Sequence, residues 1–174
     1  MERKVRKMSN LEVEEASESN SNYVNIYNNE LLGCIGVYSV IKHIKSISSA
    51  KALLILPFVF QNDLVSYIGR SNVHIKSIEQ LILRKPELIS NFNERFYALL
   101  RVSVNSILML NALGFLAIRP NGKIELLGEE DFIPSYEKRV IGIRATQIVK
   151  ASPKIAKLLE DKVENLYLQL RVKL

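Results

Sequence analysis

The chain has 174 residues, a formal net charge of +6, 48% hydrophobic residues, no Trp and a single cysteine. This length suits one domain that buries about two-thirds of its unfolded surface, and the aliphatic composition suits a helical core. A lone Cys34 excludes an internal disulfide and fits the reducing cytoplasm. Because no run of about 18 uncharged apolar residues occurs, we expect no membrane span.

Residues 1–22 are predicted to form a disordered leader. They carry four basic and five acidic side chains with only scattered apolar residues, too few to offset the entropy of ordering. A basic DNA-binding arm is the alternative, and the glutamates disfavour it. Residues 23–174 then form a single domain with 20 basic and 13 acidic side chains, a net +7. This excess permits phosphate contact without establishing it.

Apolar residues at intervals of three and four predict a first helix from Asn28 or Asn29 to about Ser46. Gly33 and Gly36 lie inside it, and each costs roughly 1 kcal/mol relative to Ala in a helix. We therefore expect them to allow the close approach of another helix.

Three shorter helices are expected next, over residues 50–56, 63–68 and 78–83. Pro57 ends or kinks the first of them, because proline lacks the backbone N–H that a helix uses. Ser77 with Gln80 forms a capping pattern before the third. Pro86 suits the first position of a short helical turn that leads to the longest apolar segment.

That longest segment is predicted to be a central helix. Asn91 with Glu94 forms a capping pattern, and Gly114 suits a left-handed stop. In between, Glu94, Arg101 and Asn105 fall on one narrow stripe and nearly every other residue is apolar. A helix that is apolar over most of its circumference is expected to be packed on several sides.

Two β-prone runs follow Gly114, over residues 115–119 and 123–127, joined by Pro-Asn-Gly. A winged helix-turn-helix unit has the same order of elements: a short helix, a break at a proline, a long helix and a hairpin. The predicted fold is therefore mainly α with a small β-hairpin, a winged-helix-like helical domain. A helical bundle with one hairpin fits the same pattern.

The basic excess and the wing-like turn suggest weak DNA contact on the hairpin and on the nearby break between helices. The residues of this hypothesis are Arg84, Lys85, Arg119 and Lys123.

Beyond the hairpin, residues 129–131 form an acidic loop that we expect to be solvated, since nothing nearby completes a metal site. A helix over residues 136–151 is expected, and Ser152-Pro153 is predicted to start a final amphipathic helix. Such a terminal helix closes its own core or serves a partner. We expect partner contact through Leu166, Leu170, Val172 and Leu174.

Catalytic patterns are missing from the sequence. Two histidines and one cysteine provide none of the usual zinc sets, and there is no GxxxxGK[ST] phosphate loop. Glu125 is the only acidic residue placed as in a hairpin nuclease, and it stands alone. We therefore expect no enzyme activity, no cofactor and no metal.

Several short runs occur in the order and spacing of a known family. These are Tyr27-Asn28 before the helix Glu30–His43, then ALLILP (52–57), SIEQL (77–81), PEL (86–88), FNER (92–95), LGFL (113–116) and the closing stretch Leu166–Leu174. With them the chain resembles the middle components of bacterial three-component ABC-ATPase conflict systems. It resembles in particular the small C subunit of Lamassu-type antiviral defence.

The resemblance implies a non-catalytic, cytoplasmic adaptor subunit. In such systems an SMC-like ABC ATPase senses DNA and a separate effector, often a nuclease, does the damage. The middle component joins the two and helps to control the effector, so DNA is met mainly through the complex. The alternative is a winged-helix transcription regulator, whose recognition helix must expose polar and basic side chains. An effector enzyme is a third class, which the residue inventory disfavours.

Overall fold

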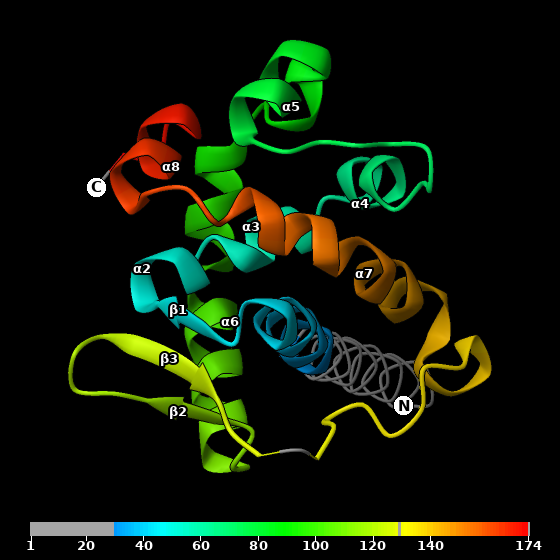
Figure 1. Ribbon diagram of the computed structural model, residues 1–174, viewed down its shortest axis with the longest axis vertical. Helices are drawn as coiled ribbons and strands as arrows, with labels where there is room; N and C mark the ends of the chain where they lie inside the picture. The colour runs from blue at the N-terminus through cyan, green and yellow to red at the C-terminus, as the bar shows by residue number, and fades with distance from the viewer. Residues whose placement is uncertain (1–29, 129, 174) are drawn as a thin grey trace, which may run out of the picture.

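A computed structural model describes residues 30–128 and 130–173, so the expected leader and Leu174 lie outside the described residues. The described chain begins with a helix over residues 30–44. The elements that follow are β1 (Ser46–Ser48), α2 (Ser49–Ala52), α3 (Ile55–Val59), α4 (Asn62–Ile68), α5 (Ile78–Arg84), the 3-10 turn η1 (Pro86–Leu88), α6 (Phe92–Ala112), β2 (Leu116–Ile118), β3 (Lys123–Leu126), α7 (Lys138–Leu158) and α8 (Val163–Gln169) (Figure 1). The protein is mainly helical with a small antiparallel sheet, which confirms the coarse fold prediction.

The sheet has three strands in the order β1-β3-β2, all antiparallel. The predicted hairpin supplies β2 and β3, with Ile118 opposite Ile124. The strand β1 was not predicted, and in it Ile47 lies opposite Ile124 on the other side of β3. Lys45 adopts a left-handed conformation with φ 69°, which turns the chain out of the first helix and into this short strand.

The most enclosed element is the five-residue helix α3, in which every residue, Pro57 included, is buried. It packs against α4, α6 and α7, and the buried side chains of the domain form one cluster around it. Figure 1 shows α3 between the long helices α6 and α7. The proline suits this place because it stands in the first turns of the helix, where few backbone N–H groups have helical partners.

The close approach predicted for Gly33 and Gly36 is confirmed. A Cβ atom on Gly33 would lie 2.3 Å from the Ser106 Oγ atom of α6, and one on Gly36 would lie 2.8 Å from a methyl of Val59 in α3. The first helix therefore contacts both neighbours along a side that has no room for side chains. Cys34, between the two glycines, is 1% exposed.

Two details of α6 differ from the prediction. Asn91 precedes it in a left-handed conformation with φ 55° and its side chain makes no capping hydrogen bond, so the predicted capping pattern is wrong. The stop at Gly114, with φ 79°, is as predicted. The helix is also not packed on all sides, because Tyr97, Val104 and Leu108 are 50%, 40% and 51% exposed.

The helix start predicted at Ser152-Pro153 is wrong, because both residues lie inside α7. Ser152 is buried and its hydroxyl donates to the Ile148 carbonyl at 2.8 Å instead of capping. Pro153 is exposed, so water can bond the carbonyl that loses its helical partner. The interruption lies instead at Gly142, with φ 82°. The apolar residues assigned to one final helix are divided between α7 and the short helix α8.

Candidate interaction surfaces

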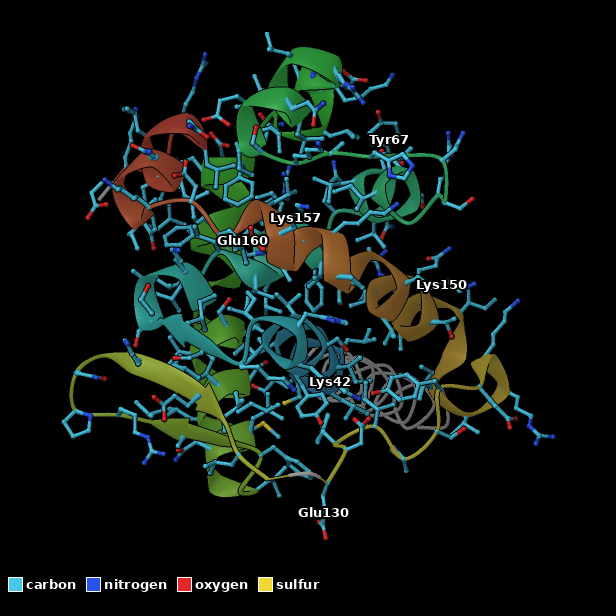
Figure 2. All side chains as sticks on the ribbon, in the orientation of Figure 1. Lys42, Tyr67, Glu130, Lys150, Lys157 and Glu160 are labelled. Atoms are coloured by element: carbon cyan, nitrogen blue, oxygen red, sulfur yellow. The ribbon has the colours of Figure 1, made fainter. Side chains whose placement is uncertain are left out.

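A polar cluster joins Lys42, Asp131 and Tyr136. The Lys42 ammonium forms an ion pair with the Asp131 carboxylate and donates to the Tyr136 hydroxyl at 2.9 Å. The same hydroxyl donates to Asp131 at 2.6 Å. Figure 2 labels Lys42 on the first helix, and the cluster ties that helix to the loop between β3 and α7.

This cluster is suited to fastening the loop rather than to proton transfer. The hydrogen bond to Asp131 raises the pKa of Lys42. Burial alone would raise the pKa of Asp131, but the hydrogen bonds from Lys42 and Tyr136 outweigh it and the pKa is lowered. Both groups are therefore charged at neutral pH, where a general acid or base needs a pKa near the working pH.

Cys34 does not have the environment of a reactive thiol. Burial raises the pKa of its thiol group, whereas nucleophilic cysteines have lowered pKa values and some access to solvent. Its Sγ atom lies 3.7 Å from the backbone carbonyl oxygen of Ser106. The residue packs the first helix against α6.

The four cations proposed for DNA contact do not form one surface. Arg84 and Lys85 lie at the end of α5, at the top of Figure 1, whereas Arg119 and Lys123 lie on the hairpin at the lower left. Three of them bond to neighbours: Arg84 to the His74 carbonyl at 3.2 Å, Lys85 to Glu87 at 3.2 Å and Arg119 to Glu125 at 2.8 Å. Lys123 is exposed. DNA contact through these residues stays a prediction.

The leucines proposed for partner contact lie mostly inside the domain. Leu166 and Leu170 are 0% and 1% exposed, and Val172 is partly buried against the same core. Leu174 is outside the described residues. The backbone N–H of Lys173 donates to the Asn93 side chain at 3.0 Å, which holds the last residues against the start of α6. Partner contact through this end stays a prediction.

An apolar surface on α6 was not foreseen. It consists of Tyr97, Arg101, Val104 and Leu108, spaced by four, three and four residues, and we call it the α6 face. Ile118 of β2, 41% exposed, adjoins the same helix because its N–H donates to the Asn111 side chain at 3.2 Å. A signal for this surface existed in the sequence, since the polar stripe through Arg101 marks the side of the helix that meets solvent.

Helix α7 presents a different surface. Its 21 residues include six cations and no carboxylate. Two of the cations serve the fold: Arg144 donates to the Val59 carbonyl at 3.2 Å, and the Lys154 ammonium donates to three carbonyls beyond α4 and at its end, at 2.6 to 2.9 Å. Lys150 and Lys157 are exposed and are labelled on α7 in Figure 2.

Open hollows lie on the surface of the described residues, and two of them lie beside α6 and β1. One of about 620 Å³ lies between η1, the start of α6 and the C-terminal residues, and is lined by groups such as Asn91, Glu94 and Arg171. The other, of about 490 Å³, runs along β1 and is lined by groups such as Lys51 and Glu160. Within residues 30–128 and 130–173, no group of three or more His, Cys, Asp or Glu side chains is placed to hold a metal ion.

No single helix in the described part of the chain is long and apolar enough to cross a membrane. One pair of segments, Ser49–Val59 with Asn62–Ile68, reaches the required length and composition together, but the two are bent by 94°. In this structure α3, within that pair, is buried in the core.

The chain was compared with known protein families, curated proteins and solved structures. The family model "ABC-three component (ABC-3C) system Middle Component 3" matches residues 17–174. No match was found among curated proteins or among solved structures.

Proposed function

We propose an adaptor function for this chain, which belongs to the ABC-three component (ABC-3C) system middle component 3 family. A component of a three-component system has partner components. In our proposal the chain is a non-catalytic, cytoplasmic subunit that joins an SMC-like ABC ATPase to an effector nuclease and helps to control that effector, as the resemblance to Lamassu-type defence implies. DNA is met mainly through the complex.

The observation that carries this proposal is the α6 face. It places a row of large apolar side chains in solvent on a helix whose other side is fixed in the core. Contiguous exposed apolar surface of this kind marks interaction sites in soluble proteins. The polar cluster around Lys42 and the buried Cys34 are engaged in packing and fastening, which supports a role in assembly rather than in chemistry.

We further propose that the domain is winged-helix-like. A helix, the strand β1, further helices, α6 and the β2–β3 hairpin follow one another, and the three strands form one sheet. In this assignment the hairpin is the wing and α6, directly before it, takes the place of the recognition helix.

A DNA-binding transcription regulator is the competing function. A recognition helix that enters the major groove presents polar and basic side chains to base edges and phosphates. The outward side of α6 instead presents Tyr97, Val104 and Leu108, with Arg101 as the only charged residue between Phe96 and the helix end. These side chains favour a protein partner.

Co-purification tests the adaptor proposal directly. The full-length chain would be co-expressed with the two other components of its own system, with an affinity tag on the ATPase, followed by size-exclusion chromatography. We expect one complex that contains all three chains. A folded chain that elutes alone beside folded neighbours would contradict the proposal.

The absence of catalysis has a separate test in an infected or plasmid-challenged host. A variant with Cys34→Ala, His43→Asn and His74→Asn should keep the activity of the whole system. Loss of that activity with unchanged thermal stability and unchanged co-purification would reveal a chemical site in this chain.

A further inference from the structure

We infer that the α6 face is the docking site for one amphipathic helix of another component, apolar along one side and with a carboxylate opposite Arg101. This inference rests on the proposed adaptor function and names the surface that would perform it. Three features support it: the shape of the face, the anchoring of α6, and the position of its single charge.

The shape of the face suits a helix. Tyr97, Arg101, Val104 and Leu108 repeat at intervals of four, three and four, the spacing of a helix–helix seam. From Tyr97 to Leu108 the row covers about three turns, roughly 16 Å at 1.5 Å per residue. None of the four side chains lines either of the hollows described above. A row of side chains of this length is matched by the groove between side chains of a second helix.

The face is also held in place before any partner arrives. On the opposite side of α6, Phe92, Ser106 and Leu110 are buried, and Ser106 lies against Gly33 of the first helix. At the exposed end, the Tyr97 hydroxyl donates to the Lys173 carbonyl. A preorganised surface loses little conformational entropy on binding, so its apolar area contributes more of its free energy to affinity.

Arg101 determines what the occupant must carry. It lies in the middle of the row and makes no ion pair with any described residue. Burying an arginine without an opposite charge is strongly unfavourable, so a tight partner must bring a carboxylate to it. A second copy of this chain has no carboxylate on α6 beyond Glu94, and the phosphates of a nucleic acid would leave the apolar side chains unmatched.

The experiment uses the full-length chain co-expressed with the other two components. Leu108→Glu combined with Val104→Glu introduces negative charge into the row at two positions that are exposed in the wild-type chain. Leu83→Glu on α5 is the matched control, because Leu83 is 84% exposed and lies away from α6. Arg101→Glu and Arg101→Lys test the charge with little change in packing. Circular dichroism and thermal melting would verify the fold of each variant.

We expect the double variant and Arg101→Glu each to weaken binding to one component at least tenfold, with Arg101→Lys losing less and Leu83→Glu nothing. Folded face variants that bind like the wild-type chain would overturn the docking site while leaving the adaptor function intact. A wild-type chain that binds neither component would overturn both. If the double variant fails to fold, the Arg101→Glu variant becomes the test. Wild-type affinity of that variant for the other components would then overturn the inference.

Two further results would identify a different occupant and overturn the inference. One is a homodimer of the wild-type chain alone that dissociates when Leu108→Glu is introduced. The other is a labelled DNA duplex that competes with the partner for the wild-type chain and no longer binds after Leu108→Glu.

Discussion

Helices α6 and α7 are each 21 residues long and both pack against the buried helix α3, yet their solvent-exposed sides differ in chemical character. The outer side of α6 is a row of apolar residues around a single arginine. The outer side of α7 bears exposed lysines and no acidic residue. Two helices that pack in the same core can therefore expose chemically different side chains to solvent. Those of α6 suit an apolar partner, and those of α7 suit an anion.

The overall composition hides this separation. A net charge of +6 and 48% hydrophobic residues describe a moderately basic, ordinary domain. Only the position of each residue on its helix reveals that α6 exposes a row of apolar side chains and that α7 carries six cations without a carboxylate. The predictions below test each part of this arrangement.

The largest effect is expected at the end of the chain, which packs beside the start of α6. Leu170→Ala should lower the free energy of unfolding by about 2–5 kcal/mol, because Leu170 is 1% exposed and its loss leaves a cavity. Leu168→Ala is the control, since Leu168 is 78% exposed and should change stability by less than about 0.5 kcal/mol. Urea unfolding measures both. Equal stability of the two variants would show that the closing residues are not part of the core.

A second change loosens the inner side of α6. Gly33→Val should destabilise the domain by about 1–3 kcal/mol, because new methyl groups would overlap Ser106, Leu56 and Val102. Gly33→Ala should cost less, and Ser106→Ala should reduce that cost because it removes the nearest atom. Thermal melting of the single and double variants gives the coupling. An unchanged melting temperature for Gly33→Val would contradict the close contact between the first helix and α6.

A third change separates the structural lysine of α7 from the exposed ones. Lys154→Met should lower stability by about 1.5 kcal/mol, because three carbonyl groups lose a charged donor. Lys150→Met, on the exposed side of the same helix, should have almost no effect on stability. Chemical denaturation would compare them. If both substitutions changed the stability by the same small amount, Lys154 would contribute no more to the fold than an exposed lysine.

A smaller, pH-dependent effect is expected at the cluster between the first helix and the loop before α7. Lys42→Met should cost about 0.5–1 kcal/mol at pH 7, a modest value because the pair is partly exposed and screened by solvent. The lowered pKa of Asp131 adds stability above its unfolded pKa near 4, and this part is lost as the pH falls through the folded pKa. The difference in the free energy of unfolding between Lys42→Met and the wild-type chain should therefore become smaller at acidic pH. If this stability difference stayed constant from pH 7 to pH 2, the ion pair between Lys42 and Asp131 could not be the cause of the destabilisation.

The smallest effect concerns weak association with DNA. Charge reversal of Lys150 and Lys157 together should weaken binding of a labelled duplex at low salt several-fold and reduce the salt slope by up to about 2. Reversal of Arg84 and Lys85 should do less, because both already bond to neighbours. Fluorescence anisotropy over a salt series measures this. A larger effect of the second pair would favour the break after α5 as the site of phosphate contact.

Much of the fold was predictable because its local signals agree with its tertiary structure. Glycines spaced three apart in an apolar helix indicated a close helix contact, and the structure has it at Gly33 and Gly36. Pro-Asn-Gly between β-prone runs indicated a hairpin, and Gly114 indicated the end of α6. At these positions the backbone preference of one or two residues is sufficient to determine the local structure.

The errors occurred where local signals compete with packing. Ser152-Pro153 has the form of a helix start, yet the buried residues on both sides of it keep α7 continuous. The strand β1 is three residues long and forms only because β3 offers it an edge. The sequence alone also does not reveal that the Leu166 and Leu170 side chains are covered by the rest of the domain, and partner contact through this end stays a prediction.

The sequence by itself determined that this chain is mainly helical and that a hairpin follows its longest apolar helix. Only the tertiary structure decided which apolar residues are covered. Helical periodicity reports the side of a helix on which apolar residues lie, but burial depends on whether another element packs there. The apolar row on α6 therefore became a candidate docking site, and Leu166 and Leu170 became part of the core, only when the neighbouring elements were in place.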